Sequence, residues 1–363
     1  MQIETLELSN FRNYDLLFME FDEGINIIYG ANAQGKTNIL ESIYMCSFGK
    51  SHKGSKERDI IKEGEEEGHI KGCFSGEHGK ERVDIHLKAG GSKGIAVNRV
   101  PIKRVSELYG RIKTVIFSAE DLDIIKRGPA ARRKFMDMEL CQLDKLYVDD
   151  LIKYSRIRQQ RTELFKKLEE EPKEKEELFE TLDIWDLQLV NTGISLIKRR
   201  KKFIEEINNI IFDIHYDLSA GEEKLKIVYE PSVSEEDFYE ELRRSRQKDM
   251  ITKATNVGPH RDDFSFFVNG KNMKVFGSNG QQRTCALSLK LSEIRLIEEI
   301  KKEKPVLLLD DVLSELDRSR QKQLLKSLGK TQTMITCTGV DEFIETEIGR
   351  ARKFQIEKGK IKE

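Results

Sequence analysis

The chain has 363 residues, of which 38% are hydrophobic and 35% are charged, and its formal net charge is −1. This length allows one large domain or two to three ordinary ones. The balanced charge excludes a global attraction to nucleic acid, so any DNA site must be a local basic patch. Five scattered cysteines without metal-ligand spacing argue against disulfides and zinc. The sequence shows neither a signal peptide nor a membrane-length apolar run, and we expect a cytoplasmic protein without membrane contact.

The N-terminal part of the chain predicts three strands followed by a helix. Alternating apolar residues over 2–8 indicate a half-buried strand, and a second strand ends near Phe21. The apolar run 25–29 indicates a buried strand, and 38–44 has helical spacing. The residues between them fit G-x-x-x-x-G-K-[ST], the phosphate-binding P-loop: Gly30, Ala31, Asn32, Ala33, Gln34, Gly35, Lys36 and Thr37.

Each part of this loop has a chemical reason. Glycines at 30 and 35 let backbone N–H groups close around the β-phosphate, and the helix N-terminus adds its positive dipole end. Lys36 carries charge to the β- and γ-phosphates, and the Thr37 hydroxyl is placed to ligate Mg²⁺. The sequence therefore predicts a nucleotide site at this turn.

A helical module interrupts the nucleotide-binding part of the chain. After charged strands over 69–100 and a short buried strand at 115–117, apolar residues recur at three- and four-residue steps from Leu140 to Leu168, with one gap at Arg161. A second series runs over 178–214, and a polar turn at Pro172 joins the two. This spacing favours a short antiparallel helical hairpin; the alternative is two amphipathic helices packed on a globular core. We place the head at 1–127 and 253–363, and the helical arm at 128–252.

The chain then returns to mixed α/β character. Residues 263–268, the turn Asn269-Gly270 and residues 274–276 indicate a hairpin, and a long amphipathic helix is expected from Ser278 to about Lys302. A continuous apolar strand over 306–309 ends in two carboxylates, Asp310 and Asp311. Further elements are expected as a helix over 316–328 and strands at 333–336 and 353–356.

A buried strand that ends in acidic residues is typical of a Walker B strand, which delivers a carboxylate to the edge of the sheet where Mg²⁺ lies. Asp310 would then hold the metal, directly or through water, and Asp311 would polarise the attacking water. Taken alone, the pattern is equally compatible with a buried strand capped by acids. The P-loop earlier in the chain favours the nucleotide interpretation.

Further segments carry a specific resemblance. Residues 278–282, Ser-Asn-Gly-Gln-Gln, resemble the signature sequence of ABC-type ATPases, and Ser314-Glu315-Leu316-Asp317 resembles their D-loop. Their order and spacing are similar to the branch that contains SMC-type chromosome and DNA-repair ATPases. Four segments resemble the bacterial RecF family of recombination mediators: Asn10-Phe11-Arg12-Asn13-Tyr14, Phe117-Ser118-Ala119-Glu120-Asp121-Leu122, Gly258-Pro259-His260-Arg261-Asp262-Asp263 and Leu309-Asp310-Asp311-Val312-Leu313.

The resemblance implies an α/β fold, an ABC/SMC-like P-loop ATPase head with an inserted helical arm. It also implies bound ATP and Mg²⁺, and a homodimer in which two protomers sandwich two ATP molecules. Lys36 and Asp311 are the expected catalytic residues, and Thr37 and Asp310 are the expected metal ligands. The expected nucleotide contacts are the eight P-loop residues together with Arg12, Asn13, Asn38, Ser278, Gly280 and Gln281.

The function implied by the resemblance is ATP-dependent DNA binding. A dimer would clamp duplex DNA next to single-stranded gaps and promote recombinase loading in repair, replication restart and SOS induction, with mediator partners such as RecR. The resemblance implies a weak, DNA-dependent ATPase, and two departures from the ABC pattern favour a slow switch over a motor. Asp311 stands where ABC ATPases usually have Glu, and residues 335–338 read Ile-Thr-Cys-Thr where they carry a switch His. The sequence does not place a Q-loop glutamine.

Basic clusters offer candidate DNA contacts. No aromatic residues are interleaved with them, so recognition of the duplex backbone fits better than base stacking. For each cluster the alternative is an ordinary solvated helix face, and for 258–261 the alternatives are a rigid turn and a nucleotide-facing turn. The candidates are Lys53, Lys56, Arg58, Arg132, Arg133, Lys198, Arg199 and Arg200.

Three other functions compete with this interpretation. A chromosome-tethering SMC head needs far longer helical arms than this chain provides. A transporter ATPase subunit needs the switch His and a docking surface for a membrane partner. A P-loop kinase leaves the signature at Ser278 unexplained.

Overall fold

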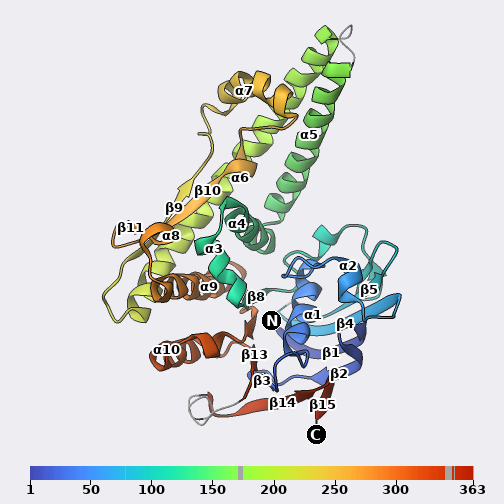
Figure 1. Cartoon of the computed structure of the whole chain (residues 1–363), viewed down its shortest axis with the longest axis vertical. Coiled ribbons are helices and arrows are strands. Elements are labelled where there is room, and N and C mark those ends of the chain that lie inside the picture. The colour runs from blue at the N-terminus through green and yellow to red at the C-terminus, as the bar shows by residue number, and fades with distance from the viewer. Residues whose placement is uncertain (78, 171–174, 340–345, 347, 363) are drawn as a thin grey trace. The chain divides into compact units, whose positions relative to one another are not determined.

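The computed structural model describes all residues except 78, 171–174, 340–345, 347 and 363. The chain forms two compact units (Figure 1). The head unit comprises residues 1–121 and 290–363, and the inserted unit comprises residues 122–289. Helix α9 (Asn279–Lys301) begins in the inserted unit and ends in the head unit. No helix among the described residues is long and apolar enough to cross a membrane.

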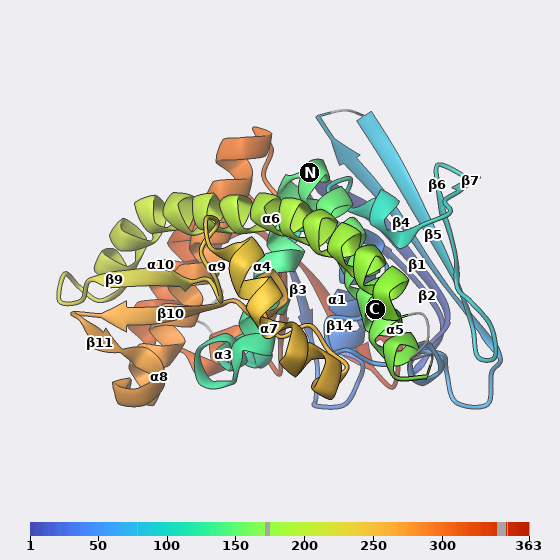
Figure 2. The ribbon, with the colours of Figure 1, turned by 90° about the horizontal axis from the view of Figure 1, so that it is seen from above.

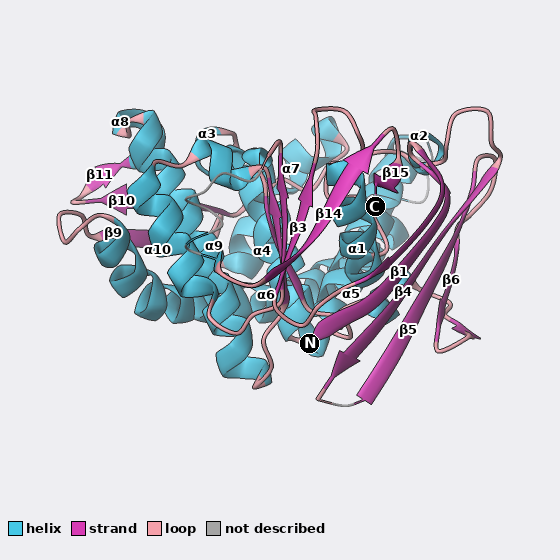
Figure 3. Cartoon of the chain, turned by 90° about the horizontal axis from the view of Figure 1, so that it is seen from below, coloured by secondary structure: helices cyan, strands magenta, loops and turns pink. Residues whose placement is uncertain are grey.

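The head unit contains an antiparallel sheet in the order β2-β1-β4-β5-β6-β7 (Figure 3). Alternating residues of β1 and β4 are buried, and this pattern is typical of a sheet with one face on the core and one in solvent. The strands are β1 (Gln2–Phe11), β2 (Tyr14–Glu20), β4 (Glu67–Gly76), β5 (Gly79–Lys88), β6 (Gly94–Val97) and β7 (Val100–Pro101).

The second sheet of the head unit has the order β15-β14-β3-β13-β12-β8, and every pair except β14–β15 is parallel. Its central strands are buried along almost their whole length, which is typical of a parallel sheet covered on both faces. The strands are β3 (Ile25–Tyr29), β8 (Thr114–Phe117), β12 (Val306–Asp310), β13 (Thr333–Cys337), β14 (Ala351–Glu357) and β15 (Lys360–Lys362). The helices of this unit are α1 (Lys36–Phe48), α2 (Glu57–Ile60), α10 (Arg318–Leu328) and the 3₁₀ turns η1 (Val105–Leu108), η2 (Ala119–Asp121) and η5 (Val312–Glu315).

The inserted unit is built around two long helices that run side by side, α5 (Lys145–Glu170) and α6 (Lys175–Leu218). Helix α6 also packs on the small antiparallel sheet β9-β10-β11 and on α7 (Figure 2). The remaining elements are α3 (Leu122–Lys126), α4 (Pro129–Leu143), β9 (Leu225–Glu230), α7 (Phe238–Thr252), η4 (Pro259–Arg261), β10 (Asp263–Val268), β11 (Lys271–Asn272) and α8 (Met273–Phe276).

The unit therefore combines the two arrangements that the helical spacing left open, a helical hairpin and long helices on a small core. The predicted turn at Pro172 lies outside the described residues. The gap at Arg161 has a physical cause. The Arg161 guanidinium is fully buried between Asp186 and Asp249, with N–O distances of 2.6 Å to each, so an ion pair replaces the apolar contact at this step.

One domain boundary and one element differ from prediction. Residues 253–289 were expected in the head, whereas they pack with the inserted helices because β10 pairs antiparallel with β9. The Asn269-Gly270 turn is present with positive φ at both residues, 48° and 78°. Its second strand is only β11, and residues 273–276 form a helical turn capped by the Asn272 side chain, not the expected strand.

Candidate nucleotide site

The P-loop lies between β3 and α1, and its two outer glycines are required by close packing. Gly30 has a φ of 151°, and a Cβ there would lie 2.3 Å from the Ile356 carbonyl oxygen. Gly35 has a φ of 107°, and a Cβ would lie 2.5 Å from the Asn13 amide and 2.8 Å from the Tyr14 hydroxyl. Larger residues at either position would displace neighbouring backbone or side chains, so the loop conformation depends on glycine.

Lys36 lies inside the loop. Its side chain is buried, and its ammonium donates hydrogen bonds to the carbonyl oxygens of Gly30 at 2.7 Å and Ala31 at 2.8 Å. No carboxylate among the described residues forms an ion pair with it. The positive charge is therefore held at the loop by neutral partners that an anion can replace.

The turn after β1 supports the P-loop from outside. The Asn13 amide donates to the Gln34 carbonyl at 2.9 Å and accepts from the Asn38 amide at 2.8 Å, and the Tyr14 hydroxyl donates to the Gly35 carbonyl at 3.0 Å. A cavity of about 970 Å³ lies beside Asn13 and Asn38. Asn13 and Asn38 thus lie at the loop, and their predicted contact with a nucleotide stays a prediction.

Arg12 lines the same cavity but has carboxylate and backbone partners. Its guanidinium donates to both oxygens of Glu41, at 2.9 and 2.6 Å, and to the Asp59 carbonyl at 2.7 Å. Burial alone would raise the pKa of Glu41, but hydrogen bonds from Arg12 and Ser51 hold that pKa below its ordinary value. The Arg12 side chain is 19% exposed. Arg12 therefore lies beside the loop, and its contact with a nucleotide stays a prediction.

The two predicted metal ligands come together where α1 begins and β12 ends. One oxygen of Asp310 accepts hydrogen bonds from Thr37 Oγ1 at 2.8 Å and from Thr336 Oγ1 at 2.7 Å. Thr336 lies on β13, directly opposite Asp310 in the parallel register, and β13 separates β12 from the P-loop strand. The strand order therefore brings a hydroxyl and a carboxylate to one point beside the loop.

Asp311 is exposed and has an unusual backbone conformation. Its φ of 54° and ψ of 20° are left-handed, which aspartate tolerates better than most residues. Its N–H donates to Thr336 Oγ1 at 2.9 Å. This geometry turns the chain directly after Asp310 and leaves the Asp311 carboxylate in solvent at the carboxyl end of the sheet. Thr338 and Gly339, just after β13, are also exposed.

The signature residues form the start of α9 in the inserted unit. Gln281 N donates to Ser278 Oγ at 3.2 Å, and Ser278 N donates to Gln281 Oε1 at 3.0 Å, so the two residues form a reciprocal capping box. The Gln281 amide also donates to Glu223 at 2.7 Å, and Glu223 lies 3.2 Å from the buried ring of His215. A Cβ on Gly280 would meet nothing nearer than Ser278 Oγ at 3.9 Å.

Two of the predicted DNA contacts are structural residues, and the prediction is wrong for them. Arg132 is buried and forms a two-pronged ion pair with Asp263, at 2.5 and 2.8 Å. Arg200 is 2% exposed and bonds to Asp137 at 2.8 Å and Asp262 at 2.9 Å. Both guanidiniums neutralise carboxylates inside the unit, so neither is available to a phosphate backbone.

The other candidates differ in exposure and partners. Arg133 donates to the Asp262 carbonyl at 2.8 Å, and Arg199 forms an ion pair with Asp144. Lys198 is 63% exposed and lies 3.5 Å from Glu235. The three basic residues around α2 are exposed: Lys53, Lys56 and Arg58.

The segment 258–261 forms a rigid turn. His260 Nδ1 accepts from the Tyr154 hydroxyl at 2.8 Å, and Nε2 donates to the Thr255 carbonyl at 2.8 Å. Gly258 has a φ of 124°, and a Cβ would lie 2.4 Å from the Tyr154 hydroxyl. Burial lowers the pKa of His260 to about 4. These contacts within the inserted unit explain the conformation of residues 258–261.

Sequence reasoning missed three residues that hold the site. Thr336 bonds to Asp310, Tyr14 supports the loop, and Glu223 holds Gln281. Thr336 had a signal, since it lies in the strand after the Walker B pattern, but the parallel register that pairs it with Asp310 is not readable from spacing. Glu223 had none.

Comparison with known proteins identifies the family. Residues 2–347 match the family described as RecF/RecN/SMC N terminal domain. A relative from Lachnospira eligens, named DNA replication and repair protein RecF, is 54% identical over 361 residues, which cover 99% of both chains. The protein of the same name from Lachnoclostridium phytofermentans is 51% identical, with the same coverage. The chain belongs to the RecF family.

Solved structures agree with this placement. A structure described as the recombination mediator protein RecF with ATP, in the RecFOR pathway, superposes with a TM-score of 0.91 at 38% identity and covers 99% of this chain and 96% of that chain. The head domain of Smc from Pyrococcus furiosus superposes with a TM-score of 0.58 at 17% identity, which shows a shared fold alone. The fold is therefore the predicted ABC/SMC-type ATPase head with inserted helices. Family membership removes the transporter-subunit and kinase alternatives.

Proposed function

We propose that this protein binds ATP and Mg²⁺ in the head unit and acts as an ATP-dependent DNA-repair switch. The observation that carries the proposal is the meeting of Thr37 and Asp310, 2.8 Å apart, beside a P-loop whose lysine has only carbonyl partners. The P-loop backbone from Gly30 to Asn38 would receive the phosphates, with Lys36 leaving its carbonyl partners for the β- and γ-phosphates.

The residues present fit Mg²⁺. A threonine hydroxyl and a carboxylate are hard oxygen ligands, and Mg²⁺ is typically bound by one or two such groups together with substrate phosphates. Thr37 and Asp310 would hold the ion, and Thr336 would orient the Asp310 carboxylate from the neighbouring strand. When bound, the ion neutralises charge that develops on the phosphate oxygens.

Hydrolysis is assigned to Asp311 and Lys36. The exposed Asp311 carboxylate would orient and deprotonate water at the sheet edge, and Lys36 would stabilise charge on the γ-phosphate. Asp311 is one methylene shorter than glutamate, and exposed Thr338 and Gly339 follow β13 in place of an imidazole. Both features support slow turnover, and its dependence on DNA is part of the proposal.

Asp311→Asn tests this assignment. The amide can still hydrogen-bond water but cannot accept its proton, so the variant should bind ATP with wild-type affinity and lose nearly all hydrolysis. Phosphate release under saturating ATP gives the rate, and calorimetry gives the affinity. Wild-type turnover in the variant would remove Asp311 from the mechanism.

The signature residues support a sandwich dimer. Ser278, Gly280 and Gln281 lie at the N-terminus of α9, where backbone N–H groups and the helix dipole favour a phosphate. The space around Gly280 shows that packing inside the chain does not require a glycine there. We assign these residues to the γ-phosphate bound by a second protomer.

The relatives named for DNA replication and repair support a role on DNA. The dimer would hold duplex DNA beside single-stranded gaps in the cytoplasm and promote recombinase loading, replication restart and SOS induction together with mediator partners such as RecR. The exposed cluster Lys53, Lys56 and Arg58 is the preferred phosphate contact, with Lys198 and Arg133 as further candidates. Arg199, which is already paired with Asp144, would contribute least.

Ser278→Arg tests the dimer. The bulky side chain should block closure without touching the P-loop, so the monomer should bind ATP yet neither dimerise nor hydrolyse it. Ser234→Arg is the matched control because Ser234 also caps a turn of the inserted unit, through Asp237. Light scattering with and without ATP measures mass. ATP-dependent mass doubling in Ser278→Arg would contradict the sandwich.

A further inference from the structure

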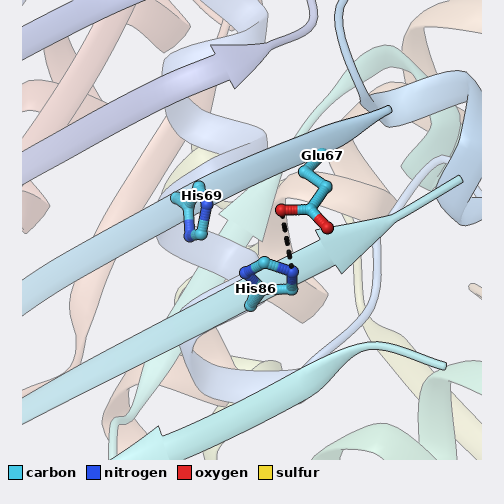
Figure 4. Close-up of side chains that lie close together, drawn as sticks. All are labelled: Glu67, His69 and His86. Carbon is cyan, nitrogen blue, oxygen red and sulfur yellow. Dashed lines mark ion pairs between the residues drawn. The ribbon is translucent and has the colours of Figure 1, made fainter. Parts of the chain in front are cut away.

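The solvent face of the antiparallel sheet in the head unit carries two histidines and a glutamate in direct apposition. His69 on β4 pairs in register with His86 on β5, and Glu67 pairs with Lys88. The alternate residues Ile70 and Ile85 are buried in the core, so the three polar side chains share the opposite face (Figure 4). Strand register, not sequence proximity, brings the two imidazoles together.

The spacing of these groups matches the coordination of a small divalent ion. One nitrogen or oxygen atom from each of Glu67, His69 and His86 lies within 4.8 Å of the other two. His86 Nε2 is 3.6 Å from Glu67 Oε2. Tetrahedral Zn²⁺, with bonds of about 2.0–2.2 Å, sets its ligand atoms roughly 3.3 Å apart. Small side-chain rotations therefore suffice to close the site.

The flanking strands leave room for a further ligand. Ser9 on β1 pairs with His69, and Gly94 on β6 pairs with His86. No large side chain therefore stands beside either imidazole along this row. Both rings line a groove of about 780 Å³ on this face. A fourth coordination position thus has access to the groove.

A charged neighbour supports the carboxylate of this cluster. Lys88 Nζ lies 3.4 Å from Glu67 Oε1, which leaves Oε2 toward His86 and supplies an outer-shell partner for the carboxylate.

We propose that Glu67, His69 and His86 form a three-ligand Zn²⁺ site with a fourth position open to the groove. Two imidazoles, one carboxylate and an open position are a known zinc ligand set. Cu²⁺ and Ni²⁺ suit the same ligands, whereas Mg²⁺ prefers oxygen ligands throughout. The expectation against zinc rested on cysteine spacing, which does not report on histidines joined across strands.

Calorimetric titration of the full-length, tag-free protein with Zn²⁺ tests the proposal. Excess Mg²⁺ occupies the separate site at Thr37 and Asp310, and ATP is left out because it chelates Zn²⁺ itself. One equivalent of Zn²⁺ should bind, and Co²⁺ in its place should give the intense visible absorption of a tetrahedral complex. Glu67→Gln and His69→Gln should each weaken Zn²⁺ binding by more than roughly tenfold, the minimum typical of losing an outer-shell partner.

Cys73→Ser is the matched control because Cys73 lies on the same strand and the same face as His69 and is itself a zinc-ligand type. It should bind Zn²⁺ like the wild type. The exposed position of His69 makes His69→Gln a variant that keeps its fold, checked by circular dichroism and ATP binding. Failure of the wild type to bind Zn²⁺, or equal affinity in His69→Gln, would overturn the site. Either result leaves the proposed ATP function untouched.

Discussion

The P-loop and the basic residues of the inserted unit were both predicted to bind phosphate, but their basic side chains have different partners in the structure. Lys36 is held by two carbonyl oxygens, whereas Arg132 and Arg200 are held by buried carboxylates. A carbonyl partner leaves the positive charge uncompensated and open to an incoming anion. A carboxylate partner neutralises it, and separating the pair leaves an unpaired buried charge. What decides the role of a basic side chain here is its partner.

The first and largest contrast concerns Lys36. Lys36→Met should abolish ATP binding because the loop loses the cation that reaches the β- and γ-phosphates. Lys198→Met removes the same charge from an exposed helix position and should leave affinity unchanged. Titration calorimetry with ATP and Mg²⁺ compares the two variants. Full affinity in Lys36→Met would refute the P-loop assignment.

The second contrast concerns the stability of the inserted unit, where a paired basic residue should matter more than an exposed one. Arg200→Ala should lower the free energy of unfolding of the inserted unit by about 3–5 kcal/mol because Asp137 and Asp262 are left without their counter-charge. Lys198→Ala should change it by less than about 0.5 kcal/mol. Trp185, the single tryptophan, packs against the Leu164–Phe165–Leu182 core of this unit and reports its unfolding in denaturant. Equal stability of Arg200→Ala and wild type would show that the buried pairs contribute nothing.

These contrasts explain which parts of the fold and site were predictable. The P-loop, the strand ending in Asp310 and the capping pair Ser278–Gln281 are local patterns, in which neighbours in sequence are also neighbours in space. The spacing of apolar residues likewise predicted α5, α6 and α9.

The remaining features depend on pairing between distant segments. Arg132 meets Asp263, and Thr336 meets Asp310, only because of strand and helix packing. A run of basic residues in the sequence carries no information about such partners. The DNA contacts predicted from basic clusters were therefore the weakest predictions. Residues 253–289 were misplaced for the same reason, since the β9–β10 pairing is long-range.

A third, smaller effect is that the two units should lose stability over different pH ranges. Burial lowers the pKa of His260 from an ordinary 6.5 to about 4. The folded state resists protonation, so this stability is present above pH 6.5 and is lost as pH falls toward 4, by at most about 3 kcal/mol.

The head unit loses stability at lower pH. Burial alone would raise the pKa of Glu303, but hydrogen bonds from Lys113, the Glu77 N–H and the N-terminal amine lower it to about 2. That stability is present above pH 4.5 and is lost as pH falls through 2. The free energy of unfolding, measured by denaturation followed by Trp185 fluorescence, should therefore decrease between pH 6.5 and 4. His260→Gln should flatten this pH dependence. An unchanged pH profile in the variant would assign it to other groups.

The smallest expected effect concerns DNA itself, and it sharpens the comparison between compensated and uncompensated charge. Backbone binding releases counterions, so log K falls with log salt by about 0.9 for each phosphate neutralised. Replacing exposed Lys53, Lys56 and Arg58 by glutamine should reduce this slope by up to about 2.7 for duplex with a single-stranded gap. Lys198→Gln should reduce it by at most about 0.9.

Arg199→Gln should leave the slope nearly unchanged, because its guanidinium is already paired with Asp144. Binding is measured by fluorescence anisotropy with ATP present, over a range of salt concentrations. Little dependence on DNA sequence is expected, since phosphates rather than base edges are contacted. A wild-type slope in the triple variant would place the DNA on another face. A large change in Arg199→Gln would show that DNA displaces Asp144, and that a carboxylate partner does not exclude phosphate binding.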